Sequence, residues 1–508
     1  MPKRTAIIDI GSNSARLVIY EKTSRYGFHL ICEQKSKVRI GEGAYEKGGY
    51  LQPVGIRRAF LALQSFLQTI QKYKATKTLC VATSALRDAP NGTDFVKWVK
   101  RSLGLHIRII DGQKEATYGA IAVKNLLPVT DAVTIDIGGG SADMTLIHQG
   151  KIVESFSLNV GTVRLKELFF DKEPSRKEAY KKAKAYVKKE LERLPHTFRS
   201  SVAVGIGGTA RTLSKAIMKQ IDYPLDKLHA FSYQIDAHKT YLKEITHASV
   251  KGLKKFDLKK NRYDTIREGT IIWLEILDEI GAQEVVTSSV GVREGVFLEQ
   301  LLKHEHLSFP SGVNPSVTSL LDRFKTYVTS PTKRRHKRRL GRKLYDLFQC
   351  EIQDDKRYAY ELETALKLSN IGKTLTIYRA HQHAFYIAMQ ELNYGFTHKQ
   401  MLLTALLLRM HGKELLHKPL FKSFESLLPE KETLLWLSFI YTLSIFLHEA
   451  SNDAHISFSY ENQTLRIYSD QSLYLAKEKI KALEKPASFA IIIEDEENLP
   501  KCQALGIV

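Results

Sequence analysis

Two short segments of this chain repeat one combination of residues: an aspartate, glycines and side-chain hydroxyls that follow a short apolar run. The first is Asp9–Ser14, with the sequence Asp-Ile-Gly-Ser-Asn-Ser, and the second is Asp136–Ser141, with the sequence Asp-Ile-Gly-Gly-Gly-Ser. A strand that ends in a glycine turn can present successive backbone N–H groups to an anion, and serine hydroxyls add similar donors. The two turns together predict a site that holds phosphate from two sides. The expected phosphate ligands in the turns are Ser12, Asn13, Ser14, Gly138, Gly139, Gly140 and Ser141.

Other groups suited to phosphate follow further short apolar runs in the same part of the chain. A guanidinium can hold two phosphate oxygens at once, and glycines at a helix start expose N–H groups to an anion. The candidates are Arg87 at the end of Ala82–Arg87, Gly208 and Thr209 within Gly205–Ala210, and the arginines Arg164 and Arg267. Taken singly, each also fits an ordinary turn or a surface ion pair, so the prediction depends on their number.

Glu115 is the best candidate for acid–base chemistry. It follows the expected strand Ile107–Ile110 and the turn or cap Asp111-Gly112, in the first turn of a helix with small residues on one face. A carboxylate there can face a cleft, although an acid in the first turn also complements the helix dipole. Asp136 and Asp143 bracket the second glycine turn, and carboxylates beside substrate phosphates suit Mg²⁺. Asp136 could instead cap its own turn.

These candidates require two lobes to position them. The spacing of the two turns is that of a domain and not of a solenoid repeat, so we expect a duplicated α/β lobe with a cleft between the copies. Residues 1–130 and 131–308 both alternate short strands with amphipathic helices. Residues 309–450 repeat apolar residues at helical spacing, which predicts an all-α domain, and residues 451–508 predict a small α/β domain that begins with a hairpin.

The chain of 508 residues is strongly basic, with 76 Lys and Arg, 55 Asp and Glu, and a formal net charge of +21. The run Lys333–Lys343 supplies only part of this excess, so a polyanionic ligand is a reasonable partner. The run itself fits either a solvated, flexible stretch after Pro331 or a contact to nucleic acid or a long phosphate chain. No stretch of roughly 18 apolar residues and no signal-peptide pattern is present, and the four cysteines lack metal or disulfide spacing. We therefore expect a cytoplasmic protein without a membrane span.

The motifs, in their order, resemble those of the exopolyphosphatase/guanosine pentaphosphate phosphohydrolase (Ppx/GppA) family. The matching strings are Ala6–Ser14, Ala82–Arg87, Ile110–Ala116, Ile135–Ser141, Gly161–Leu165, Gly207–Ala210 and Gly291–Val296. The resemblance implies the α/β fold class of actin, hexokinase and Hsp70, with duplicated lobes. It also implies a helical HD-like domain of the kind found in the longer members of the family.

The resemblance further implies a hydrolase that removes terminal phosphate from inorganic polyphosphate, from the stringent-response nucleotide pppGpp to give ppGpp, or from both. Glu115 stands where the family has its catalytic glutamate, which orients and deprotonates the attacking water. Asp136 and Asp143 stand at the acidic positions associated with the metal, Mg²⁺. Many members carry glutamate where this chain has Asp143, whose side chain is one methylene shorter.

The helical domain departs from an intact HD domain, which has His-Asp or His-Glu before Ile-Gly. This chain has Leu368-Ser369-Asn370-Ile371-Gly372 instead, and neither serine nor asparagine is a good metal ligand. His381, His383 and His411 are therefore expected to be solvated or hydrogen-bonded. We interpret the domain as a scaffold that helps to form a basic channel or the surface of a homodimer.

Two other functions fit parts of the sequence. An ATP-dependent small-molecule kinase shares the fold class, and Gly205–Ala210 could cradle a nucleoside, but Glu115 and the basic surface count against it. A nucleic-acid-binding protein that uses the run 333–343 would bind RNA in a salt-dependent way. The preferred hypothesis is Mg²⁺-assisted hydrolysis of a phosphoanhydride in the cleft between the lobes.

Overall fold

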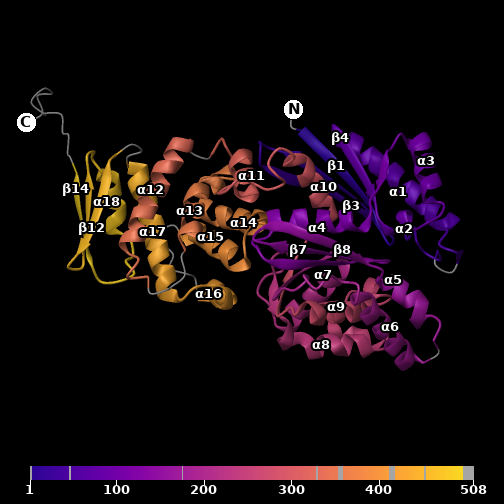
Figure 1. Cartoon of the computed structure of the whole chain (residues 1–508). Helices are drawn as coiled ribbons and strands as arrows, with labels where there is room; N and C mark the ends of the chain where they lie inside the picture. Colours follow the sequence, from indigo (N-terminus) through magenta and orange to yellow (C-terminus); the bar gives the residue numbers. More distant parts are fainter. Residues whose placement is uncertain are drawn as a thin grey trace, which may run out of the picture. The chain divides into compact units, whose positions relative to one another are not determined.

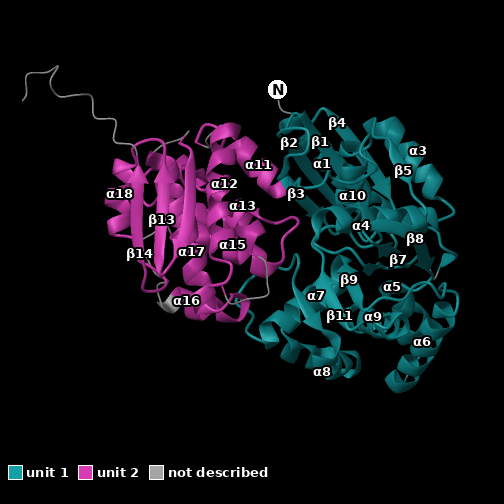
Figure 2. Cartoon of the chain, turned by 60° about the vertical axis from the view of Figure 1, so that its left-hand side comes forward, with its two compact units in different colours: residues 1–315 teal, residues 316–508 magenta. Residues whose placement is uncertain are grey.

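The computed structural model divides the chain into two compact units, Met1–Pro315 and Ser316–Val508 (Figures 1 and 2). The structure describes residues 3–44, 47–173, 175–327, 330–352, 358–410, 418–450 and 454–495.

The first half of unit 1 is built on a five-stranded sheet with the order β3-β2-β1-β4-β5. Its strands are β1 (Lys3–Ile10), β2 (Ala15–Lys22), β3 (Phe28–Ser36), β4 (Lys77–Ala82) and β5 (Ile107–Ile109). The helices of this half are α1 (Pro53–Lys72), α2 (Ser84–Arg87) and α3 (Gly92–Leu103). β1 pairs antiparallel with β2 and parallel with β4, so it is a central strand, and its buried Ile8 and Ile10 belong to the core of this half.

The second half repeats this arrangement in a six-stranded sheet with the order β10-β11-β9-β6-β7-β8. Its strands are β6 (Ala132–Ile137), β7 (Ala142–His148), β8 (Lys151–Leu158), β9 (Val202–Ile206), β10 (Ser232–Gln234) and β11 (Glu284–Thr287). The helices are α5 (Thr162–Leu165), α6 (Arg176–Leu191), α7 (Gly207–Gln220), α8 (Ile235–His247) and α9 (Ile266–Ile280), with the π-helical turn η2 (Lys166–Phe170). β6 pairs antiparallel with β7 and parallel with β9, as β1 does with β2 and β4. The expected duplication of α/β lobes is therefore confirmed.

Two helices join the halves of unit 1: α4 (Gly112–Leu126) and α10 (Val292–Leu301). α4 follows the first sheet in sequence but packs on β7 and β8 of the second. The helices approach each other at backbone distance, because a Cβ on Gly295 would lie 2.0 Å from the carbonyl oxygen of Tyr118. This packing fixes the start of α4 at the junction of the two halves.

Unit 2 is helical and ends in a small sheet. Its helices are α11 (Pro315–Arg323), α12 (Pro331–Leu347), α13 (Ala359–Leu368), α14 (Ala380–Glu391), α15 (His398–Met410), α16 (Lys418–Phe424) and α17 (Lys431–Ala450). The last elements are β12 (Ile456–Glu461), β13 (Thr464–Ser469), α18 (Tyr474–Lys481) and β14 (Ala490–Asp495), with the sheet order β12-β13-β14. The helical region and the final α/β segment predicted from the sequence are both present.

The basic run lies in α12, so the expectation of a flexible stretch there is wrong. The hydroxyl of Ser330 accepts a hydrogen bond from the N–H of Lys333, and Pro331 occupies the first helical turn, which favours a helix start at this point. Lys337 is only 2% exposed, and its ammonium donates to the hydroxyl of Ser369, one of the two residues that replace the HD pair.

Of the three histidines considered in unit 2, His381 and His383 lie in α14, and His411 lies outside the described residues. Within the described residues, no three His, Cys, Asp or Glu side chains come together as a metal site. α17 has the length and hydropathy of a membrane-crossing helix, but 78% of its apolar window is buried inside the fold, as in the core helix of a helical domain.

Candidate active site

The two glycine turns lie in the wall of one cavity of about 680 Å³ between the halves of unit 1. The turns are close neighbours, because a Cβ on Gly139 would lie 3.2 Å from the Cβ of Ser12. Each turn connects the two strands of its own hairpin, and the two hairpins have the same register. Ile10 pairs with Ala15 in the first hairpin, and Ile137 pairs with Ala142 in the second.

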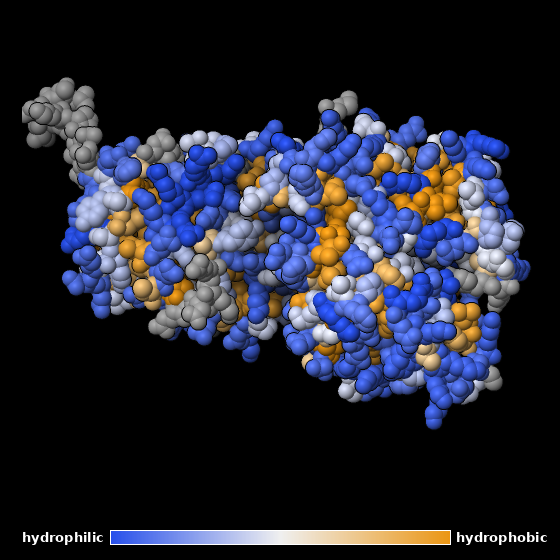
Figure 3. All heavy atoms as spheres, viewed as in Figure 1, coloured by the Kyte–Doolittle hydropathy of each residue, from blue (hydrophilic) through white to orange (hydrophobic). Residues whose placement is uncertain are grey.

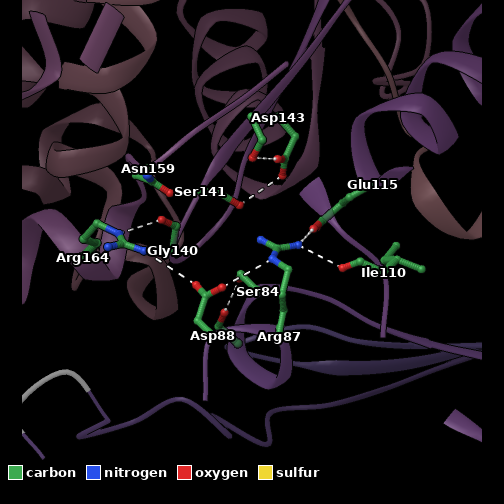
Figure 4. Close-up of polar contacts among 12 residues, drawn as sticks. Ser84, Arg87, Asp88, Ile110, Glu115, Gly140, Ser141, Asp143, Asn159 and Arg164 are labelled. Carbon is green, nitrogen blue, oxygen red and sulfur yellow. Dashed lines mark hydrogen bonds and ion pairs between the residues drawn. The ribbon is translucent and has the colours of Figure 1, made fainter. Parts of the chain in front are cut away.

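The second turn is held from behind by the segment that starts α5. The N–H groups of Thr162 and Val163 donate to the carbonyl oxygens of Gly138 and Gly139, at 3.0 Å each. The guanidinium of Arg164 donates to the carbonyl oxygen of the remaining glycine, Gly140, at 2.8 Å (Figure 4). Because every glycine carbonyl of the turn has a partner on this side, the turn keeps one fixed shape. Within the described residues the N–H groups of Gly139 and Gly140 donate to no protein acceptor. Gly139 lines the cavity, so its N–H group is available to an anion there, whereas the predicted phosphate ligand Gly140 is buried and is not part of the wall.

The first turn is held in the same way by the segment after β3. The N–H groups of Arg39 and Gly41 donate to the carbonyl oxygens of Asn13 and Ser12, at 3.0 Å and 3.4 Å. The hydroxyl of Ser12 lies 3.2 Å from that of Ser84, at the start of α2. Each turn is therefore preorganised by backbone contacts from its own lobe.

Glu115 lies in the cavity wall at the start of α4, where the carboxylate of Asp111 caps the helix by accepting from the N–H of Lys114 at 2.7 Å. Its side chain is 15% exposed, and its Oε2 lies 3.3 Å from Nη1 of Arg87 (Figure 4). Burial raises the pKa of Glu115 well above its ordinary value, and the negative charge of Asp143 adds to this effect, whereas Arg87 opposes it. A carboxylate with these properties is suited to general-base chemistry near neutral pH.

Arg87 stands behind Glu115 and not in the cavity wall itself. Its guanidinium also donates to the carbonyl oxygen of Ile110 at 3.1 Å, and its Nε lies 3.4 Å from Asp88 (Figure 4). These contacts orient the catalytic candidate Glu115. The same Asp88 lies 3.7 Å from Arg164 of the other lobe, so Asp88 connects the two sides of the cleft.

The carboxylates at the ends of β1 and β6, Asp9 and Asp136, both line the cavity. Within the described residues neither carboxylate accepts a hydrogen bond or forms an ion pair. Burial raises the pKa of both groups, although nearby guanidinium groups oppose the effect. Two partly buried carboxylates in the cavity wall, without protein partners in the described residues, are donors of the kind that Mg²⁺ uses together with substrate oxygens and water. These two residues therefore fit Mg²⁺. The sequence analysis named Asp136 as a metal ligand but did not name Asp9 in that role.

Asp143 has a different environment. One of its oxygens accepts from the hydroxyl of Ser157 at 2.5 Å and the other from Ser141 at 3.2 Å, and the residue is 3% exposed. It is not part of the cavity wall. Burial raises the pKa of Asp143 to about 7 despite the bond from Ser157, and the charge of Asp136 contributes. The predicted metal role of Asp143 is thus less well supported by its contacts than that of Asp136.

The remaining predicted phosphate ligands divide into two groups. Gly208 and Thr209 lie in the cavity wall at the start of α7, and Arg262 packs directly on Gly208. Arg267 does not reach the wall: its side chain is 12% exposed, and its guanidinium lies 3.8 Å from the buried Glu268 in the same helix.

The sequence analysis missed most of the cations in the wall. The cavity is also lined by Arg16, Lys35, Arg211, Arg262 and Arg293. Burial lowers the pKa of Arg211 to about 10, with a further effect of Arg293, and burial lowers the pKa of Lys35 to about 8, with further effects of Arg16 and Arg262. Cations that depress one another's pKa mark a site for a strongly anionic ligand. One signal in the sequence could have identified two of these cations. Arg16 and Arg211 each stand two residues after a predicted phosphate ligand, Ser14 and Thr209.

Duplicated α/β lobes with a glycine turn from each lobe on a shared cavity define a protein of the actin, hexokinase and Hsp70 fold class. The model of the Ppx/GppA phosphatase family matches residues 18–304. The chain therefore belongs to the Ppx/GppA phosphatase family.

A curated relative is the bifunctional 3-dehydroquinate synthase/phosphatase of Fusobacterium nucleatum, which is 33% identical over 311 residues. The match covers 58% of this chain and 46% of that protein, so the chain spans less than half the length of this relative.

Solved structures support the fold of unit 1. The Ppx/GppA family member of Aquifex aeolicus is 30% identical with a TM-score of 0.52, and the match covers 60% of this chain and 100% of the other. An exopolyphosphatase of Cytophaga hutchinsonii, 21% identical, has the same fold with a TM-score of 0.54 and the same coverage.

Proposed function

We propose that this protein hydrolyses the terminal phosphoanhydride bond of inorganic polyphosphate and of pppGpp, which it converts to ppGpp. The observation that carries the proposal is the placement of one carboxylate, Glu115, in the wall of the cavity that both phosphate turns line. Family membership supports a phosphatase, and the cations of the wall support a substrate with several negative charges.

In this proposal the terminal phosphoryl group binds between the turns. The N–H group of Gly139 and the hydroxyl of Ser12, both in the cavity wall, neutralise charge on its oxygens. Glu115 accepts a proton from the attacking water while the new O–P bond forms. The bond from phosphorus to the bridging oxygen breaks, and this oxygen leaves as the new terminal oxygen of the shortened chain.

Mg²⁺ is part of the proposal as the resident cofactor, held by Asp136 and Asp9. When bound, it supplies positive charge to the phosphate oxygens of the bond that breaks. Arg87 keeps Glu115 directed at the cavity and keeps part of its population ionised.

The test compares Glu115→Gln with wild-type enzyme and with Glu192→Gln, a control at an exposed glutamate without an ion pair in the described residues. Phosphate release is measured from pppGpp and from long polyphosphate side by side at defined magnesium. We expect kcat of Glu115→Gln to fall by about 10² to 10⁴ on both substrates, with unchanged KM, while the control retains wild-type turnover.

Near wild-type turnover of Glu115→Gln on both substrates would contradict the assigned base. Consumption of ATP that depends on a small acceptor, without phosphate release from polyphosphate, would instead indicate a kinase.

A further inference from the structure

A second basic segment lies next to the cavity, between α8 and α9. It spans residues 251–262 and contains the short 3₁₀ helices η3 (Gly252–Phe256) and η4 (Lys260–Arg262). Its apolar side chains Leu253, Phe256 and Leu258 are buried and anchor it in the second lobe. All of its lysines are exposed. The visible face of the chain shows many hydrophilic side chains among smaller apolar areas (Figure 3). We call Lys251, Lys254, Lys259 and Lys260 the lysine track.

The charges of the lysine track are not used within the protein. Among the described residues, none of its four members forms an ion pair or a side-chain hydrogen bond. A fifth lysine of the segment, Lys255, lies 3.6 Å from Glu244 and is therefore not counted.

The basic run on α12 contrasts with this track. Arg338 and Arg342 form ion pairs with Glu363, and Lys343 donates to the carbonyl oxygen of Ile456. The ammonium of Lys337 is bound to Ser369. The more conspicuous run therefore spends much of its charge on the fold of unit 2, whereas the lysine track leaves its charge available to a ligand.

The lysine track leads into the cavity. Arg262, two residues after Lys260, lies in the cavity wall and touches the phosphate loop, since its Nη2 would be 2.1 Å from a Cβ on Gly208. Asp264 and Thr265, which follow, also line the wall. Lys259 and Lys260 stand three and two residues before Arg262, so a chain of negative charges that leaves the cavity past Arg262 passes close to this end of the lysine track.

We propose that the lysine track binds the distal part of a long inorganic polyphosphate whose terminal phosphate occupies the cavity. This inference rests on the proposed function and deepens it, because it makes long polyphosphate the preferred substrate class. A cavity of about 680 Å³ is the size of a site for a single small ligand, so only a long chain extends beyond it.

The composition of the segment favours polyphosphate over nucleic acid. Sites for single-stranded nucleic acid combine positive charge with exposed aromatic side chains on which bases stack. Among residues 251–262 the one aromatic side chain, Phe256, is 2% exposed. Charge without stacking surfaces suits a polyanion that has no bases.

The experiment replaces the four lysines of the track by glutamine in the full-length chain. The matched control replaces four other exposed lysines of unit 1 that lie outside the cavity wall and form no ion pair in the described residues: Lys72, Lys97, Lys100 and Lys303. Both variants lose the same net charge. KM and kcat are measured for long polyphosphate, tripolyphosphate and pppGpp over a range of salt concentrations.

We expect the track variant to raise KM for long polyphosphate about tenfold, as four exposed charge contacts would together supply. Its KM should also depend less on salt, and the log–log slope should fall by roughly 0.7 for each phosphate that no longer meets a lysine. Its kcat, and both parameters for tripolyphosphate and pppGpp, should stay at wild-type values, as should all parameters of the control variant.

An unchanged KM for long polyphosphate in the track variant contradicts the proposal that the lysine track binds this substrate. An equal rise of this KM in the track variant and the control variant contradicts it as well. Loss of single-stranded RNA retention in the track variant, with an unchanged KM for polyphosphate, overturns it in favour of nucleic acid. Absence of phosphate release from every substrate by wild-type enzyme contradicts the proposed function instead. In that case the track is tested by binding alone. The affinity for long polyphosphate is compared between the Glu115→Gln protein and the same protein with the four track substitutions, and equal affinity contradicts the role of the lysine track.

Discussion

The ion pair between Arg87 and Glu115 predicts how the pH dependence of the enzyme responds to mutation. The positive charge of Arg87 lowers the pKa of Glu115 and opposes the effects of burial and of Asp143. Arg87→Gln removes that charge, so the pKa of Glu115 rises further. Because a general base acts in its ionised form, the acidic limb of the kcat/KM profile moves to higher pH.

The size of the shift follows from the distance of 3.3 Å between Nη1 of Arg87 and Oε2 of Glu115. Coulomb's law gives about 1.3 kcal/mol at the dielectric constant of water and about 5 kcal/mol at an effective value of about 20. At about 1.36 kcal/mol per pKa unit, these limits correspond to about 1 and about 3.7 units. Carboxylates beside a guanidinium shift by about 1 to 3 units, and we expect a displacement of the acidic limb within this range.

The assay is the pH profile of kcat/KM for tripolyphosphate hydrolysis at constant free magnesium, which reports groups of the free enzyme. The control is Arg87→Lys, which retains a positive charge and should leave the limb close to its wild-type position even if the rate falls. The reasoning is refuted if the acidic limb of Arg87→Gln coincides with that of wild-type enzyme, because Arg87 then does not set the ionisation of Glu115.

Two further predictions concern the metal donors and the core of unit 2. Asp136→Asn removes one of the two partly buried carboxylates that have no protein partner in the described part of the chain, so the magnesium concentration for half-maximal activity should rise by at least about tenfold. A magnesium titration of phosphate release measures it, and an unchanged titration curve excludes Asp136 as a donor. Lys337, buried at 2% exposure, has a pKa lowered by burial to about 8 from 10.5, so the unfolded chain binds more protons than the folded one between these values. The free energy of unfolding of unit 2 should therefore rise with pH between about 8 and about 10.5. Lys337→Met should abolish this rise and stabilise unit 2 by about 2 kcal/mol at pH 7, as measured by denaturant unfolding and hydrogen exchange in α12.

The features that the sequence predicts best are local. Each glycine turn and its flanking strands lie within one hairpin, and Asp111 caps the helix that begins three residues before Glu115. A short segment determines each of these features, so propensity and spacing suffice to predict them. The duplicated fold is confirmed for a related reason, because the two hairpins repeat one local pattern.

The features that the sequence does not predict depend on contacts between distant parts of the chain. Arg293 lies in the cavity wall and Arg267 does not, yet both arginines stand next to a glutamate near the start of a helix. The direction of each guanidinium is set by tertiary packing, which sequence spacing does not contain. The basic run was interpreted by its charge alone, but the buried Leu340 and Leu344 on one face of α12 make it a packed helix.

The two hairpins also show how the duplicated site became asymmetric. Asp9 lies opposite Arg16 across the first hairpin, whereas Asp136 lies opposite Asp143 across the second. Burial raises the pKa of Asp9 and the charges of Arg293 and Arg16 oppose this effect, whereas burial and the charge of Asp136 both raise the pKa of Asp143. One lobe thus places a cation across the hairpin from its carboxylate, without a direct ion pair in the described residues, and the other lobe places a second carboxylate there, near Glu115.

The charges of the cavity together favour a ligand that supplies both positive and negative charge. Burial raises the pKa of Asp9, Asp136 and Glu115, and burial lowers the pKa of Arg16 and Arg211 in the same wall. If these groups neutralised one another directly, the carboxylates would have depressed pKa values and the guanidinium groups raised ones. Their opposite shifts mean that Asp9, Asp136, Arg16 and Arg211 lack sufficient charged partners within the protein, whereas burial of Arg293 is outweighed by the charges of Glu294 and Asp9, which raise its pKa. A cation alone would satisfy only the carboxylates, and a phosphate alone only the arginines, so these charges support the proposed substrate, a phosphate chain that arrives with its divalent metal ion.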